Sequence, residues 1–167
     1  MKNIKFSRLF AAALVVACLA LTGCKQPEEE SSYAIEGTWL DPVYGQKFEI
    51  THNELKNFYN DYITNEPKEG YTGDSLYVLE ISNTSGIIFI KYTRAADASW
   101  NYTSDSSLAP DVGKWYAVSY KDLKEDSVKL SGASKATGVT SCDTLEEAKE
   151  EFVENGYFSY YDDFVRQ

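Results

Sequence analysis

The chain has 167 residues, with 26 acidic against 16 basic side chains and a formal net charge of −10 at pH 7. A surface this acidic is repelled by nucleic acid and by anionic lipid headgroups, which excludes both as partners of that surface. The length suits a single domain with a full hydrophobic core.

The N-terminal segment has the organisation of an export signal. Lys2, Lys5 and Arg8 form a basic region, and an apolar run of 13 residues (21 − 9 + 1) extends from Leu9 to Leu21. As a helix this run would rise about 20 Å, whereas a bilayer core is roughly 30 Å thick. The pattern therefore predicts a signal segment rather than a membrane span.

The sequence Leu-Thr-Gly-Cys at 21–24 closes this segment and resembles the lipobox of bacterial lipoproteins. The resemblance implies a signal peptide at 1–23, cleavage before Cys24, diacylglycerol on the cysteine, and often a further acyl chain such as palmitate on the new N-terminus. Two or three acyl chains hold a protein firmly on a membrane. It implies a cell-envelope location, and Lys25 favours the outer membrane, with the leaflet left open. An ordinary cleaved signal followed by a chance cysteine is the alternative.

Cleavage before Cys24 would leave 144 residues (167 − 23), carrying 13 basic and 26 acidic side chains and a net charge of −13. Only Cys142 would remain as a thiol, so no internal disulfide is available to stabilise the fold. Residues 24–34 are expected to form the lipidated cysteine and a flexible tether, because 25–32 contains no large apolar side chain. The domain is expected at 35–167.

Alternation of apolar and polar residues predicts short strands along this domain. They are expected at 35–40, 46–51, 54–59, 76–81, 87–93, 114–120 and 127–132. The strands at 76–81 and 87–93 are apolar at nearly every position, so each is expected to be covered on two sides. The stretches 60–73 and 94–113 are expected to be irregular, and loops as long as the second are usually functional or disordered.

One helix is expected near the C-terminus. Asp143 is a suitable N-cap, and Glu146 three residues later completes an Asp variant of the capping box. An apolar stripe at i, i+3, i+7 and i+8 consists of Leu145, Ala148, Phe152 and Val153. Asn155-Gly156 is expected to end the helix, and 157–165 to form a final strand or a docked segment.

Several short strands with hairpin spacing, followed by one helix, predict a mainly β fold. The expected architecture is an antiparallel up-and-down barrel with the C-terminal helix packed outside. Closure would remove the exposed strand edges that promote aggregation. A two-sheet β-sandwich is the alternative.

Gly37-Thr38-Trp39 at the start of the first strand, together with the late helix, resembles the lipocalin or calycin pattern. In that superfamily a Gly-x-Trp strand closes one end of an eight-stranded barrel, and the other end opens onto a ligand cavity. The resemblance implies structural roles for Gly37 and Trp39, with Trp39 packed beneath the cavity. It also implies an arginine over the tryptophan. The candidates are Arg94 and Arg166, of which Arg166 follows the helix, whereas the lipocalin arginine precedes it.

No group of residues has the spacing of a catalytic site. His52, the only histidine, is expected to be a solvated turn residue. Cys142 is expected to be a buried filler or, ahead of the helix, a mildly activated thiol. The carboxylate pairs Asp162-Asp163 and Glu146-Glu147 are expected on solvated faces. The sequence therefore predicts a non-enzyme with no metal and no cofactor, since it has no thiolate zinc site and no nucleophile elbow.

The aromatic content is high, with 13 Tyr, 8 Phe and 3 Trp. Tyrosine combines a flat apolar face with a polar tip, which suits pockets and interfaces. Trp100 stands in a Ser/Asp-rich loop, where it could cap a barrel mouth, stack on a sugar or anchor a partner, or be buried by the loop folding back. The candidate ligand- or partner-binding residues are Trp100, Tyr102, Tyr62, Tyr71 and Trp115.

Three functions are compatible with these features. The favoured one is a membrane-anchored, lipocalin-like domain that binds a small apolar or amphipathic ligand in a cavity lined by residues such as Trp115 and Tyr116. The alternative is a surface interaction module, such as a host-protein binder or an enzyme inhibitor, whose loops 60–73 and 94–113 cluster at one end. A hydrolase using loop carboxylates is the least favoured.

Overall fold

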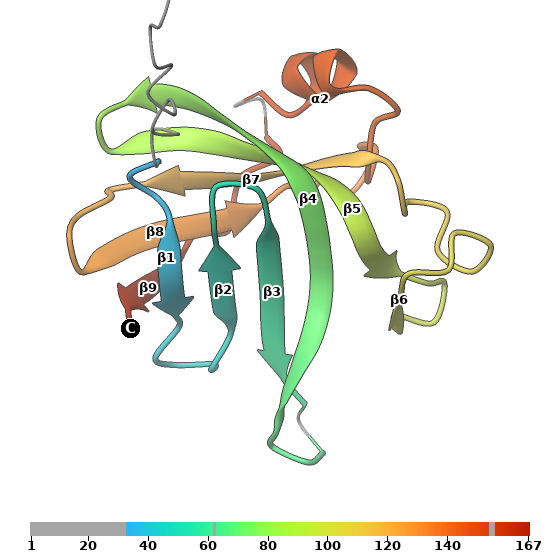
Figure 1. The fold of residues 1–167 in the computed structure, drawn as a ribbon, viewed down its shortest axis with the longest axis horizontal. Coiled ribbons are helices and arrows are strands. Elements are labelled where there is room, and N and C mark those ends of the chain that lie inside the picture. Colours follow the sequence, from blue (N-terminus) through green and yellow to red (C-terminus); the bar gives the residue numbers. More distant parts are fainter. Residues whose placement is uncertain (1–32, 62, 154–155) are drawn as a thin grey trace, which may run out of the picture. The chain divides into compact units, whose positions relative to one another are not determined.

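A computed structural model describes residues 33–61, 63–153 and 156–167 of the chain. Eight strands form a closed antiparallel barrel, with one helix, α2 (Leu145–Glu151), outside the ring (Figure 1). The two-residue strand β6 (Tyr102–Thr103) pairs with β5 alone. The strands of the ring are β1 (Gly37–Leu40), β2 (Lys47–Ile50), β3 (Leu55–Asn60), β4 (Pro67–Ser82), β5 (Ser85–Ala96), β7 (Trp115–Lys121), β8 (Ser127–Gly132) and β9 (Asp162–Arg166).

Consecutive strands of the ring pair with each other throughout. The order is β4-β3-β2-β1-β9-β8-β7-β5, and β4 pairs with β5 to complete the circle. The pairing of β1 with β9 joins the first strand to the last, with Trp39 opposite Arg166. The predicted up-and-down barrel is thus confirmed, and the sandwich alternative is excluded. The predicted signal peptide and Cys24 lie outside the described residues.

The largest difference from the predicted strands concerns β4, which starts at Pro67 and runs through the stretch expected to be irregular. Gly70 and Gly73 suggested turns, but both lie within the strand. A Cβ on Gly73 would lie 2.8 Å from the Cβ of Ile90, so glycine here permits close approach of a side chain inside the barrel. Register shifts between Thr72 and Gly73 and again before Tyr77 bend β4 around the barrel.

The barrel interior is filled by large apolar side chains. Trp39, Phe48, Ile88 and Phe164 belong to one buried cluster inside the ring. The alternating residues of β5 face the other way and form a second cluster beneath α2, which includes Ile87, Phe89, Ala117, Ala148 and Phe152. The predicted covering on both sides is confirmed for 87–93, because the helix cluster covers the outer face of β5. It is wrong for 76–81, where Ile81 is 52 % exposed.

Arg166 closes the end of the barrel that carries the short hairpins 51–54, 83–84 and 122–126, here called the closed end. Its guanidinium lies 4.2 Å from the centre of the Trp39 ring and donates hydrogen bonds to the carbonyls of Glu36 (2.8 Å) and Glu125 (2.7 Å). Gly37 has φ +145°, and a Cβ there would lie 2.5 Å from Nη1 of Arg166. Arg166 is thus the arginine that covers the Trp39 ring, and it reaches the tryptophan from the strand after the helix, unlike the lipocalin arginine, which precedes the helix.

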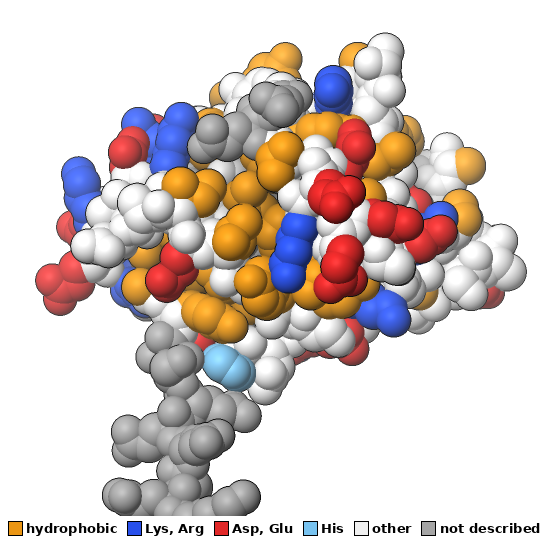
Figure 2. Space-filling model, turned by 90° about the horizontal axis from the view of Figure 1, so that it is seen from above, with side chains coloured by type: hydrophobic (Ala, Val, Ile, Leu, Met, Phe, Trp, Pro, Cys, Tyr) orange, Lys and Arg blue, Asp and Glu red, His pale blue; other side chains and the backbone are white. Residues whose placement is uncertain are grey.

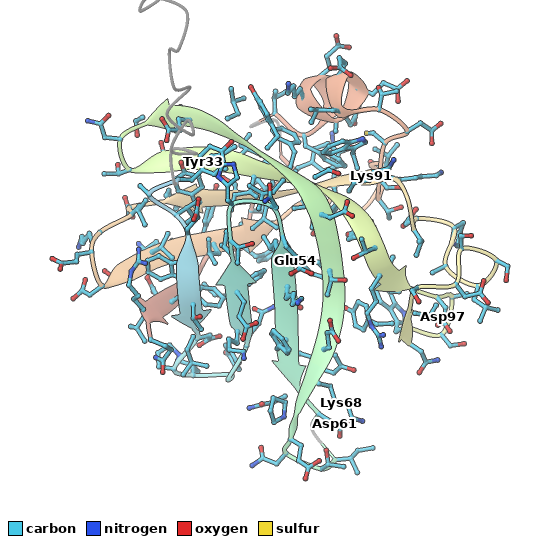
Figure 3. The ribbon with its side chains drawn as sticks, viewed as in Figure 1. Tyr33, Glu54, Asp61, Lys68, Lys91 and Asp97 are labelled. Carbon is cyan, nitrogen blue, oxygen red and sulfur yellow. The ribbon has the colours of Figure 1, made fainter. Side chains whose placement is uncertain are left out.

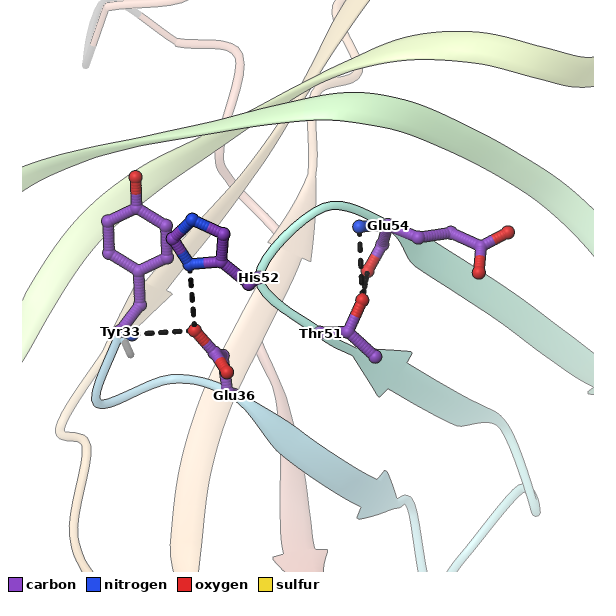
Figure 4. A network of polar contacts seen from close by, with 5 residues as sticks. All are labelled: Tyr33, Glu36, Thr51, His52 and Glu54. Atoms are coloured by element: carbon purple, nitrogen blue, oxygen red, sulfur yellow. Dashed lines mark hydrogen bonds and ion pairs between the residues drawn. The ribbon is translucent and has the colours of Figure 1, made fainter. Parts of the chain in front are cut away.

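A polar cluster joins the start of the domain to the β2–β3 hairpin at the closed end (Figure 4). The ring of Tyr33 stacks on His52, with centroids 5.3 Å apart, and the Tyr33 amide donates to Glu36 Oε1 at 2.7 Å. Nδ1 of His52 lies 3.5 Å from the same oxygen. His52 is thus a half-buried packing residue, which corrects the expectation of a solvated turn histidine.

Helix α2 begins one residue later than predicted. Thr144 is the N-cap: its hydroxyl accepts from the Glu147 amide, and the Glu147 carboxylate accepts from the Thr144 amide. Asp143 does not cap the helix, because Cys142 pairs with Trp115 in an isolated β-bridge and the chain enters the helix after this extended segment. Leu145, Ala148 and Phe152 of the predicted apolar stripe pack in the cluster beneath α2, with Ala148 and Phe152 completely buried. The helix ends at Glu151, with Phe152 as its C-cap, so it is shorter than the predicted helix that included Val153.

Replacing Thr144 with Ala is expected to lower the free energy of unfolding by about 1 kcal/mol, because the backbone amide of Glu147 loses the hydroxyl that accepts its hydrogen bond. Asp143→Ala is the matched control. Asp143 is exposed and lies 3.5 Å from Lys114, an ion pair that contributes little. Chemical denaturation of both variants measures the difference, and an equal loss from Asp143→Ala would contradict the assignment of the cap.

Seen from the helix side, hydrophobic side chains cover the middle of the molecular face and acidic side chains gather beside them (Figure 2). The half-buried apolar residues packed around the helix cluster include Tyr77, Leu79 and Phe158.

None of the helices in the described part of the chain has the length and apolar character needed to cross a membrane.

Candidate ligand-binding site

The four long connections of the barrel all leave from the end opposite the closed end. They are 41–46, 61–66, 97–114 and 133–161, and this end is here called the mouth. The connection 97–114 contacts the end of β3, since the rings of Tyr59 in β3 and Tyr102 in β6 lie 5.7 Å apart. The connections within 60–73 and 94–113 therefore share one end of the barrel, as the interaction-module hypothesis predicted.

A pocket of about 300 Å³ opens in the mouth. Its floor is a cluster of tyrosines from three strands: the rings of Tyr92 and Tyr116 stack at 5.0 Å, and Tyr71 meets Tyr116 edge-on at 5.4 Å. Tyr102 and Trp100 form the outer wall, and small side chains such as Ala95 and Ala133 leave the space open. Below the tyrosines the barrel is filled by the core, so the pocket is confined to the mouth.

Burial makes the tyrosine hydroxyls of this floor harder to ionise. The pKa values of Tyr71 and Tyr92 are raised well above the ordinary value of 10.0. The main cause is loss of solvation by burial, and repulsion from neighbouring tyrosines is a smaller one. Burial likewise raises the pKa of Tyr116, although its hydroxyl donates to the carbonyl of Ala133 at 3.1 Å. The floor is therefore an uncharged aromatic surface over the whole physiological pH range.

Stability is expected to fall as the pH rises above about 10. Below the unfolded-state pKa the hydroxyls are protonated in both states. Above it they ionise in the unfolded chain but not in the folded one, which favours unfolding. Denaturant titrations at neutral and alkaline pH measure the effect. Replacing Tyr71 and Tyr92 with Phe is expected to reduce the alkaline loss, whereas Tyr44→Phe, at an exposed position, is not. Unchanged alkaline loss in the double variant would contradict the prediction.

Trp100 is held at the rim of the pocket by an ordered turn. The Asp97 carboxylate accepts hydrogen bonds from the amides of Ser99 (2.7 Å) and Asn101 (2.9 Å), and the Trp100 amide donates to the Asp97 carbonyl at 3.0 Å. These hydrogen bonds stabilise the carboxylate and so lower the pKa of Asp97 (labelled in Figure 3). The bond from the Asn101 amide has the largest effect. Trp100 has φ +63° and is 81 % exposed. The loop does not fold back over it.

Three further aspartates build similar turns in the mouth. Asp41, Asp61 and Asp105 each accept a hydrogen bond from the backbone amide two residues later, as Asp97 does. In every case an exposed large apolar residue stands two or three positions after the aspartate: Val43, Tyr44, Ile63, Trp100 and Leu108. The mouth thus carries a rim of apolar side chains on rigid turns, and this rim is a feature that the sequence analysis missed.

The turn at Asp61 is reinforced by an ion pair. Lys68, on β4, donates to the Asp61 carboxylate (both labelled in Figure 3), and this hydrogen bond is the main reason that the pKa of Asp61 lies well below its usual range. Bonds from the amides of Thr64 and Ile63 act in the same direction. The hairpin that presents Ile63 is therefore fixed by both backbone and side-chain contacts.

The comparisons with known proteins leave the chain without a family. No protein-family profile, curated protein or solved structure matches it significantly. The functional argument therefore depends on the geometry of the mouth.

The structure brings three of the five candidate residues together. Trp100, Tyr102 and Tyr71 line the mouth pocket. Trp115 does not: it faces out of the barrel and packs against the cluster beneath α2, while its neighbour Tyr116 faces in. This corrects the expectation that Trp115 lines the cavity. Tyr62 lies outside the described residues.

Tyr92 is a pocket residue that the sequence analysis did not single out. It continues the inward series of Ile88 and Ile90 along β5, so the period-two pattern that predicted the strand also pointed to this position.

The remaining polar candidates do not form a reactive group. Cys142 is 9 % exposed, and burial, together with Glu151 and Glu147, raises the pKa of its thiol. This supports the buried-filler interpretation over an activated thiol. Among the described residues, no three or more His, Cys, Asp or Glu side chains are grouped closely enough to hold a metal ion.

Proposed function

We propose that this protein is a membrane-anchored lipoprotein whose barrel binds a small apolar or amphipathic ligand in the mouth pocket. The observation that carries the proposal is the aromatic pocket of about 300 Å³ above a filled core. Small-molecule sites are typically concave and apolar with a few polar groups, and this pocket combines tyrosine rings with Asp111, Ser134 and Lys135 at its edge. The proposal is for binding without catalysis.

The filled interior limits what can bind. Trp39, Phe48 and Phe164 are at most 3 % exposed and occupy the space that a deep lipocalin-type cavity would need. A ligand is therefore expected to place a compact group among the tyrosines and to leave any longer chain at the rim. The site is therefore smaller than a cavity lined by the alternating residues of the strands, which the sequence predicted.

The proposal is tested by titrating the purified protein with fatty acids, phospholipids, haem and oligosaccharides while following tryptophan fluorescence. Trp100 lies at the rim and Trp39 is buried, so a ligand in the mouth is expected to change the emission of Trp100. Trp100→Ala should abolish the signal, whereas Tyr160→Ala, at another exposed aromatic residue, should leave it intact. A flat response across the panel would overturn the small-ligand proposal.

The anchor is proposed from the lipobox at 21–24, with lipid on Cys24 and attachment in the outer membrane. The test is metabolic labelling with palmitate, mass analysis of the N-terminal peptide and membrane fractionation. Cys24→Ser should remove the label and release the protein from the membrane fraction. A chain that stays unlabelled while it is cleaved at another position would identify an ordinary signal peptide.

A second candidate function is a surface interaction module, and the apolar rim of the mouth favours it. Val43, Ile63 and Leu108 are 75 %, 76 % and 59 % exposed although their turns are ordered. Exposed apolar residues gathered at one end of a protein often mark an interaction site. Capture of a partner by the wild type but not by a V43S/I63S/L108S variant would support it. Ile81→Ser, at the opposite end, is the control.

A further inference from the structure

The mouth pocket contains a carboxylate that an uncharged ligand would leave unused. Asp111 lines the pocket, and its Oδ1 accepts a hydrogen bond from the Ser141 hydroxyl at 2.6 Å. Within the described part of the chain, no lysine or arginine forms an ion pair with it. Asp111 also contributes to the raised pKa of Tyr92, which shows that its negative charge acts on the tyrosine floor.

The aromatic rings that line the pocket are a second source of attraction for a cation. Aromatic rings carry a quadrupole whose negative face attracts cations. The fold uses this attraction elsewhere: the ammonium groups of Lys149 and Lys121 lie 3.8 Å and 3.5 Å from the ring centres of Tyr77 and Tyr161. In the mouth, five rings border a pocket that none of these lysines enters.

Lys135 is the one basic residue that lines the pocket, and its charge is engaged outside it. Its ammonium lies 4.9 Å from the ring centre of Tyr157, which is not among the lining residues. The Tyr116 hydroxyl is also engaged, as a donor to Ala133. The pocket therefore offers a ligand aromatic rings, one carboxylate, and the hydroxyls of Ser134 and Thr140.

We propose that the ligand of the mouth pocket carries a quaternary ammonium group, which the tyrosines and Trp100 surround and Asp111 neutralises. The inference rests on the proposed small-ligand function and specifies its chemistry. A methylated ammonium suits this lining, because its methyl groups pack against aromatic rings while its charge is attracted by the rings and by the carboxylate. An anion would be repelled by Asp111. A free choline-type molecule and the headgroup of a phosphocholine lipid share this chemistry.

The decisive experiment compares choline with its uncharged tert-butyl analogue by calorimetric titration of the purified protein at constant ionic strength. Choline is expected to bind about ten-fold more tightly, which corresponds to a moderate cation–π contribution. Equal affinities would overturn the ammonium inference and leave an apolar pocket. If neither compound binds, the ammonium inference is overturned. If, in addition, no member of the ligand panel changes the fluorescence, the small-ligand proposal is overturned too.

Two variants locate the interaction. Asp111→Asn is expected to weaken choline binding about ten-fold and to leave the analogue unchanged, whereas Asp163→Asn, at an exposed carboxylate of β9 outside the pocket, should change neither. Trp100→Leu removes one ring face at an exposed position, so it tests the proposal even if Asp111→Asn fails to fold. Unchanged choline affinity in both would overturn the assignment to this pocket.

Micelles of a phosphocholine and of a phosphoglycerol lipid then separate the two sources: tighter binding of phosphocholine micelles than of free choline identifies a lipid.

Discussion

Replacing Trp39 with Ala is expected to lower the free energy of unfolding by about 3–5 kcal/mol. The side chain is completely buried, its Nε1 donates to the carbonyl of Ile35 at 2.9 Å, and the Arg166 guanidinium covers its ring. Removal would leave a large cavity and deprive both the carbonyl and the guanidinium of their partner. Denaturant unfolding followed by circular dichroism measures the loss.

Trp100→Ala is the matched control, because it makes the same substitution at an exposed tryptophan. Its effect on stability is expected to stay within about 0.5 kcal/mol. If Trp39→Ala lowered the free energy of unfolding no more than Trp100→Ala does, the packing of Trp39 beneath Arg166 would not stabilise the closed end.

Phe152→Ala is expected to cost about 3–5 kcal/mol and to detach the end of α2 from the barrel. Phe152 is the helix C-cap and completely buried, with its ring 5.1 Å from Tyr157 and 6.2 Å from Tyr116. It is thus the main apolar contact that connects the helix cluster to the tyrosine floor. The variant should therefore also weaken ligand binding in the mouth.

Phe158→Ala provides the comparison, since Phe158 belongs to the same cluster but is only half-buried. A smaller loss is expected there, together with unchanged hydrogen exchange in the helix. Strong protection of α2 amides in the Phe152 variant would show that other contacts hold the helix.

The barrel could be predicted because most strands have one apolar face and one polar face. Ser127–Gly132 was predicted with its observed bounds, since Val128 and Leu130 alternate there with polar residues. For β4 the local pattern was misleading. Its glycines and Pro67 are typical of turns, and only the pairing with β3 and β5 holds this stretch extended.

The direction of Trp115 could not be read from the sequence for a related reason. β7 is apolar on both faces, so alternation alone does not distinguish inside from outside. The register with β5 decides it: Tyr116 lies opposite Ile90, which faces the core, and Trp115 lies opposite the exposed Lys91. This register depends on how two separate strands pair, so the local sequence of β7 does not determine it.

The first residue of the helix also depends on a tertiary contact and could not be predicted from the local sequence. Asp143 with Glu146 and Thr144 with Glu147 are two overlapping capping boxes, and local chemistry permits both. The bridge between Trp115 and Cys142 selects the second. For the site, the sequence identified Trp100, Tyr102 and Tyr71 by composition, but the apolar rim required knowing that four aspartate turns emerge at one end.

The pairing of β1 with β9 has a consequence for how the chain reaches its native state. Trp39 and Arg166 are separated by 127 positions (166 − 39) and yet lie opposite each other. Contacts of such long sequence separation slow folding, because the entropy of closing the loop must be spent before they form. Ring closure is therefore expected to be a late and slow event. The chain therefore cannot complete its barrel until 162–166 is available to pair with β1.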